Sequence, residues 1–138
     1  NVLLVDDSIV RGTTMGEIIA MARSAGAKKV YVASSAPRVC FPNVYGIDMP
    51  TRTELLCGDG KDADEVARVI GANKVVYQTV EGLRGALSDM NPEVTDFDCS
   101  CFDGRYVTGD IDEAYLRRLE AEKREAKERD KHRKAEED

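Results

Sequence analysis

The sequence has no long hydrophobic run and no excess of basic residues. Its apolar stretches are a handful of residues long, whereas a helix that crosses a membrane needs about 20. Lys and Arg number 20 against 26 Asp and Glu, which gives a formal net charge of −6. A chain with this charge is a poor match for the phosphate backbone of nucleic acid. We therefore expect neither a membrane nor a nucleic acid among its partners.

The sequence also lacks an initiator methionine, a signal peptide and a CxxC pair. An apolar run begins directly after Asn1, so we expect the chain to be a piece of a longer protein. The closest cysteines form the CxC of Cys99 and Cys101, whereas zinc and thioredoxin-like sites use CxxC. We therefore interpret the cysteines, which include Cys40 and Cys57, as reduced thiols of a cytoplasmic protein.

Short apolar runs alternate with amphipathic helical patterns along most of the chain. Residues 2–5, 29–33 and 74–78 are predicted strands, and a T-x-x-E capping box at Thr14 and Glu17 predicts the start of the first helix. The helices expected after the strands and between them cover residues 14–25, 62–70 and 79–91. Strands that alternate with helices predict an α/β fold, in which a parallel sheet is flanked by helices.

Two segments depart from this alternation. Residues 34–58 hold three of the four prolines and are predicted to be mostly loop, with a short helix near residues 53–57. From Asp112 onward the sequence predicts a long charged helix, and it lacks the apolar a and d positions of a coiled coil. We therefore divide the chain into residues 1–111 and a charged C-terminal helix or tail, residues 112–138.

The first strand leads directly into charged and small residues, in the stretch VLLVDDSIVRGTT of residues 2–14. The strand should end at the carboxyl edge of the sheet, which is the usual ligand crevice of such folds. There, Asp6 and Asp7 can accept hydrogen bonds from sugar hydroxyls or help to hold Mg²⁺. Residues 11–14 suit a phosphate, because Gly12 permits a tight turn and the next helix presents its positive end. This pattern favours a phosphorylated sugar as ligand.

This stretch resembles the 5-phosphoribosyl-1-pyrophosphate (PRPP) motif of the type I phosphoribosyltransferases. Its particular form, DDSIVRGTT, resembles the glutamine-dependent amidophosphoribosyltransferases within that superfamily. FPNVYGIDMPTRTELL at residues 41–56 and CSCFDGRYVTGDID at residues 99–112 resemble two further segments of those enzymes. The resemblance covers residues 1 to about 116 and implies a partial type I phosphoribosyltransferase-like fold.

The resemblance also implies roles for individual residues. Asp6 and Asp7 would bind the ribose 2′ and 3′ hydroxyls and Mg²⁺, and residues 11–14 would hold the 5′-phosphate. The implied PRPP-binding residues are Asp6, Asp7, Ser8, Ile9, Val10, Arg11, Gly12, Thr13 and Thr14.

The implied reaction is the first committed step of de novo purine biosynthesis. Ammonia derived from glutamine attacks C1 of PRPP and displaces pyrophosphate, which gives 5-phosphoribosylamine. This chain would supply the C-terminal part of the phosphoribosyltransferase domain and lack the glutaminase domain with its nucleophilic cysteine, so that alone it would be inactive. The resemblance further implies purine nucleotides as feedback inhibitors and a homo-oligomer.

The expected cofactor is Mg²⁺, and no iron–sulfur cluster is expected. Members of the family with a cluster have a cysteine just before the YGID segment and a CxxC before the FxGxY segment. Here Asn43 occupies the first position, and Asp98 and Cys101 would occupy the pair. A four-cysteine cluster cannot assemble from these residues.

Two other interpretations stay open. A PRPP-binding regulator would keep the motif without catalysis, although residues 41–56 and 99–112 favour the enzyme. A response-regulator receiver domain would also begin with a strand that ends in two aspartates, with Asp48 as phosphoacceptor. However, Pro42 and Gly46 make a poor buried strand before Asp48, and no Lys-Pro pair follows.

Overall fold

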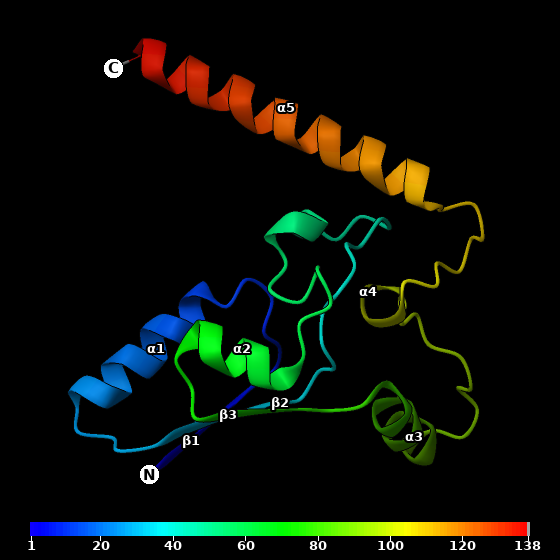
Figure 1. Ribbon diagram of the computed structural model, residues 1–138. Helices are drawn as coiled ribbons and strands as arrows, with labels where there is room; N and C mark the ends of the chain where they lie inside the picture. Colours follow the sequence, from blue (N-terminus) through cyan, green and yellow to red (C-terminus); the bar gives the residue numbers. More distant parts are fainter. Residues whose placement is uncertain (138) are drawn as a thin grey trace. The chain divides into compact units, whose positions relative to one another are not determined.

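The computed structural model describes the backbone of residues 1–137 and the side chains of residues 1–133 (Figure 1). Strands and helices alternate, as the sequence predicted, and the α/β class is confirmed. In chain order the elements are β1 (Val2–Asp6), α1 (Thr13–Ser24), β2 (Val30–Ser34), the 3-10 helix η1 (Arg52–Glu54), α2 (Ala63–Ile70), β3 (Lys74–Tyr77), α3 (Val80–Met90), α4 (Ser100–Asp103) and α5 (Glu113–Glu137).

The sheet in the described part of the chain is parallel and has the order β1-β2-β3. Val2 pairs with Val30 at one edge, and Asp6 and Tyr77 both pair with Ser34 at the other. All three strands therefore end at the same edge, and Asp6 lies there as the sequence predicted.

One face of the sheet carries the core. Helices α1 and α2 lie side by side over this face (Figure 1). The buried cluster consists of Ile9, Met15, Ile19, Val30, Val32, Leu56, Cys57, Val66, Ala67, Ile70 and Val75. The fully buried β2 valines alternate with half-buried residues, which is the two-residue period of a strand with one covered face.

The opposite face of the sheet is more exposed. Leu3 is 63% exposed, Val5 71% and Val76 55%. Parallel sheets usually have both faces covered. Apolar side chains on this face are therefore the least protected part of the sheet.

The first helix does not begin as the sequence predicted. The expected capping box at Thr14 and Glu17 is wrong, because the N-cap of α1 is Gly12, two residues earlier, with φ 79° and no side-chain cap. Gly12 lies so close to Leu56 that an added Cβ would be 2.7 Å from the Leu56 Cδ2 atom. A contact between segments distant in sequence has set this boundary.

The other helix starts follow the sequence. The side chain of Asp62 accepts a hydrogen bond from the Glu65 N–H in α2, and Thr79 accepts one from the Gly82 N–H in α3. The expected helix at residues 53–57 is wrong in extent, since only η1 forms there, with Thr51 and Glu54 as its capping box.

The charged helix α5 belongs to a separate compact unit, residues 105–138, whereas residues 1–104 form the other. Asp112 caps α5 by accepting a hydrogen bond from the Tyr115 N–H at 2.7 Å. Asp138, the last residue of the predicted tail, lies outside the described residues. Within the described residues, no helix combines the length and the apolar character that a membrane span requires.

Candidate functional site

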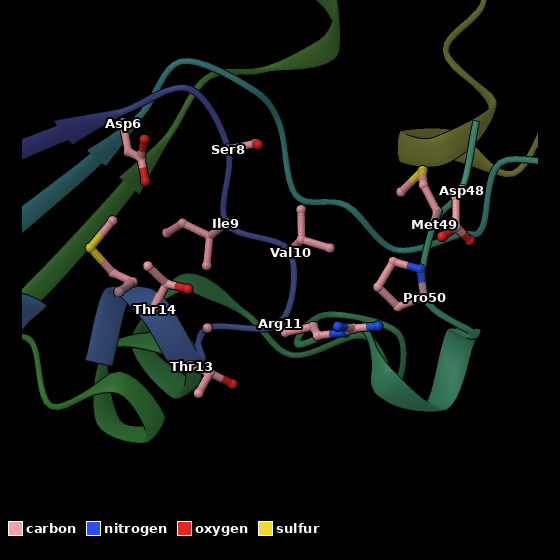
Figure 2. A pocket seen from close by; sticks show the side chains of 12 residues that line it. Asp6, Ser8, Ile9, Val10, Arg11, Thr13, Thr14, Asp48, Met49 and Pro50 are labelled. Carbon is pink, nitrogen blue, oxygen red and sulfur yellow. The ribbon is translucent and has the colours of Figure 1, made fainter. Parts of the chain in front are cut away.

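A cavity of about 460 Å³ lies at the carboxyl edge of β1 (Figure 2). Two separate stretches of the chain form its walls. The lining residues are Asp6, Ser8, Ile9, Val10, Arg11, Gly12, Thr13, Thr14, Met15, Asp48, Met49 and Pro50. Every residue of the predicted PRPP site except Asp7 therefore lines one cavity.

The two aspartates lie at the end of β1 and are held by short-range hydrogen bonds. The backbone N–H of Asp7 donates to Asp6 Oδ1 at 3.0 Å, and the Ser8 hydroxyl donates to Asp7 Oδ1 at 2.7 Å. Asp6 lines the cavity directly, whereas Asp7 is exposed beside it. Each carboxylate keeps its Oδ2 atom outside these bonds, so that both can accept from a ligand or a metal ion.

The start of α1 forms another wall of the cavity. Gly12 adopts the left-handed conformation, and Thr13 and Thr14 follow it into the first turn. Helix α1 has no side-chain cap. The first N–H groups of a helix have no partner within the helix, and they carry partial positive charge. This end of the cavity is therefore suited to an anion.

The loop between β1 and α1 is held in place by contacts with residues of the core. Ile9 is 2% exposed, and the Val10 carbonyl accepts a hydrogen bond from the Leu56 N–H at 2.8 Å. An Arg11 nitrogen lies 3.7 Å from a Glu54 carboxylate oxygen. These contacts hold the loop in shape before any ligand arrives.

The far wall of the cavity comes from Asp48, Met49 and Pro50, which lie across from the loop in Figure 2. Sequence reasoning did not assign these residues to the site. Their position depends on contacts between residues some 40 apart in sequence, which periodicity does not reveal. The signal that was available is the YGIDM segment, whose resemblance covers both Asp48 and Met49.

The cysteines do not lie at this cavity. All four are free thiols, and burial raises the pKa of each one, which disfavours the thiolate that binds metals. In the described part of the chain, no group of three or more His, Cys, Asp or Glu side chains is placed to hold a metal ion. Asn43 is buried and uses its side chain to accept backbone hydrogen bonds.

Comparison with known proteins gives close relatives over most of the chain. It is 59% identical over 116 residues to the amidophosphoribosyltransferase of Pasteurella multocida and 57% identical over 116 residues to that of Escherichia coli, and it covers 23% of each. The same alignments include 84% of this chain. The chain is a homologue of part of amidophosphoribosyltransferase.

Relatives outside bacteria and solved structures agree with this homology. The amidophosphoribosyltransferase of Schizosaccharomyces pombe is 52% identical over 120 residues, 87% of this chain and 22% of the relative. The glutamine PRPP amidotransferase of B. subtilis, solved with ADP and GMP, matches 78% of this chain and 24% of its own, with TM-score 0.66 and 39% identity. A structure of the allosteric regulatory enzyme of purine biosynthesis matches with TM-score 0.66 and 40% identity, over 78% of this chain and 23% of its own.

The homology covers a segment only. The chain spans about a quarter of the length of the curated amidophosphoribosyltransferases that it matches. No family model matches the chain. The similarity therefore relates the fold and the site region to one part of these enzymes.

Proposed function

We propose that this chain is the PRPP-binding portion of an amidophosphoribosyltransferase. One observation carries the proposal: the Asp6 carboxylate at the end of β1 and the uncapped start of α1 line one cavity, and the exposed Asp7 follows Asp6 directly. A sugar with neighbouring hydroxyls at one end and a phosphate at the other matches this pair of features. The identity of 52–59% to bacterial amidophosphoribosyltransferases supports the same assignment.

The 5′-phosphate of PRPP binds at the start of α1. The N–H groups of the first turn and the hydroxyls of Thr13 and Thr14 donate to its oxygens, and Arg11 supplies positive charge at the rim. The positive end of a helix contributes about 0.3–1 kcal/mol toward an anion. Gly12 has no side chain, so the backbone at this position can contact the phosphate directly.

The ribose hydroxyls bind at Asp6 and Asp7. Ionised carboxylates accept hydrogen bonds only, and the hydroxyls of a sugar can donate them. The same oxygens fit Mg²⁺ as hard donors, although they form only part of a ligand set that water and the substrate's phosphate oxygens complete. What bound Mg²⁺ supplies is neutralisation of the pyrophosphate charge.

The reaction forms a bond from ammonia nitrogen to C1 of PRPP and breaks the bond from C1 to the pyrophosphate oxygen. The electron pair leaves with pyrophosphate, and the nitrogen then loses a proton. This chain's residues bind and orient the sugar, so that C1 is presented to the nucleophile. Positive charge develops on the ribose ring in the transition state. The carboxylates of Asp6 and Asp7, which bind this ring, stabilise that charge.

The remaining parts of the function lie beyond these residues. Ammonia comes from glutamine through a glutaminase domain, and the chain alone is inactive. Purine nucleotides act as feedback inhibitors of the homo-oligomer; the B. subtilis relative was solved with ADP and GMP bound, which supports this part of the proposal. The free thiols fit a cytoplasmic location, where cysteines stay reduced.

The test is pyrophosphate release from PRPP and Mg²⁺ by the full-length protein that carries this chain, with glutamine or with ammonia as nitrogen donor. Release with both supports an intact amidotransferase. Release with ammonia alone keeps the PRPP site and places the glutaminase step elsewhere. Binding of PRPP without release favours a PRPP-binding regulator, and absence of both binding and release overturns the assignment.

A further inference from the structure

The far wall of the cavity is a segment without regular secondary structure. The residues that line the cavity here are Asp48, Met49 and Pro50. In the chain they come after β2 and just before η1, and they belong to neither a helix nor a strand. Asp48 is exposed, and Met49 and Pro50 are half-buried. A segment of this kind needs anchors on both sides if the cavity is to keep its shape.

The anchor after the wall is the η1 capping box. Thr51 is buried, and its hydroxyl donates to Glu54 Oε2 at 2.8 Å while its N–H donates to the same oxygen at 3.1 Å. Two residues beyond Glu54, the Leu56 N–H bonds to the Val10 carbonyl. The C-terminal side of the wall is therefore hydrogen-bonded to the loop between β1 and α1.

Before the wall, a buried side chain holds the turn. Asn43 is 6% exposed, and its Oδ1 accepts the Tyr45 N–H at 2.8 Å and the Ile47 N–H at 3.2 Å. The turn that it closes passes through Gly46, with φ 99°. Asp48 follows this turn immediately, so the two bonds to the Asn43 amide oxygen help to set the direction in which the wall leaves.

We propose that Asn43 is a positioning residue for PRPP binding, which acts by fixing the direction of the Asp48–Pro50 wall. This inference rests on the proposed function of the cavity. Asn43 does not line the cavity itself, so its effect passes through the wall. Its loss should weaken PRPP binding while the chemistry at C1, which depends on the opposite wall, proceeds at nearly the same rate.

The experiment uses the full-length protein and measures ammonia-dependent pyrophosphate release at varied PRPP. In Asn43→Ala both acceptor bonds are lost, and we expect KM for PRPP to rise about tenfold with kcat within about twofold, since each bond contributes modestly. Asn43→Asp retains an oxygen in the same place and should restore KM to within about threefold of wild type.

A matched control is Asn73→Ala. Asn73 also uses its Oδ1 to accept a backbone N–H, that of Val30 at 2.9 Å, but it lies at the amino edge of the sheet. Its replacement should lower the melting temperature and leave KM for PRPP unchanged. A purely structural role for Asn43 predicts that both alanine variants behave in this way.

If Asn43→Ala does not fold, Gly46→Ala strains the same turn from its exposed side, where a Cβ has nothing within 4 Å. We expect it to raise KM about threefold, whereas Gly60→Ala, at φ 90° and away from the cavity, should not. An unchanged KM for PRPP in folded Asn43→Ala or Gly46→Ala overturns this inference and leaves the proposed function intact. Absence of PRPP turnover in the wild type overturns the proposed function, and this inference with it.

Discussion

The starts of α1 and α2 lie over the same face of one sheet and are built in opposite ways. Helix α2 begins at Asp62, whose carboxylate accepts the Glu65 N–H at 2.8 Å while Glu65 accepts the Asp62 N–H at 2.9 Å. Helix α1 begins at Gly12, which has no side chain to offer. The start of α2 is capped by side chains of its own sequence. The start of α1 has no side-chain cap, and it lines the cavity.

The difference follows from packing around Gly12. A Cβ on Gly12 would meet Leu56 Cδ2 at 2.7 Å and Ile70 Cγ2 at 3.2 Å. This close approach and the left-handed φ of 79° both disfavour a side chain at the N-cap position of α1. Relative to glycine, a side-chain cap would add only roughly a few tenths of a kcal/mol, and an anion bound at the helix start can replace it.

The largest effect should come from filling the space at Gly12. Gly12→Val forces a β-branched residue into φ 79° and into Leu56, so we expect PRPP affinity to fall at least about 100-fold, with an added strain of about 1–3 kcal/mol. The matched control is Gly71→Val at the end of α2. It has φ 78° and open space around it, so only stability should fall. Calorimetric titration with PRPP and thermal unfolding separate the two effects, and equal losses of PRPP affinity would contradict the account.

A smaller effect should follow from removing one charge at the end of β1. Asp7→Asn keeps the shape of the side chain but weakens its bonds to hydroxyls and to Mg²⁺, and we expect a roughly tenfold to 100-fold loss of kcat/KM for PRPP. The Mg²⁺ concentration needed for half-maximal activity should rise as well. Asp89→Asn, on the exposed surface of α3, is the control. Near-wild-type kinetics for Asp7→Asn would place the sugar elsewhere.

The smallest effect should come from opening the start of α2. Asp62→Ala removes its cap and should cost about 1 kcal/mol of unfolding free energy, because the Glu65 N–H loses its acceptor. Asp62→Asn should retain most of the stability, since asparagine caps as well as aspartate does. Neither variant should change PRPP binding. A change in affinity from Asp62→Ala would mean that the two helix starts are not functionally distinct.

The sequence predicted the features that depend on near neighbours. Helices were expected to begin at Asp62, Thr79 and Asp112, and these residues do cap them, because a cap joins residues only two or three apart. The strands were placed within one residue of their observed ends, since short apolar runs define them. The loop residues Ser8 to Thr14 were assigned to a site by their chemistry and resemblance, and the cavity brings them together.

The features that sequence reasoning missed depend on distant neighbours. The T-x-x-E pattern at Thr14 and Glu17 favoured a local cap, but the approach of Leu56 to Gly12 moved the start of α1. The Asp48–Pro50 wall lines the cavity from a distant part of the sequence, between the turn that bonds to Asn43 and the Leu56–Val10 hydrogen bond. Such contacts are tertiary, and no periodicity in the sequence records them.

The most direct test of the central claim compares threonine amides in the full-length protein. With ¹⁵N-threonine labelling, ribose 5-phosphate should shift the N–H signals of Thr13 and Thr14 at the open start of α1. The N–H of Thr79, which donates to Gln78 Oε1 at 2.8 Å beside the capped start of α3, should not move. Shifts confined to Thr13 and Thr14 are the predicted result. Binding that moves neither of them would contradict the assignment of this helix start as the phosphate site.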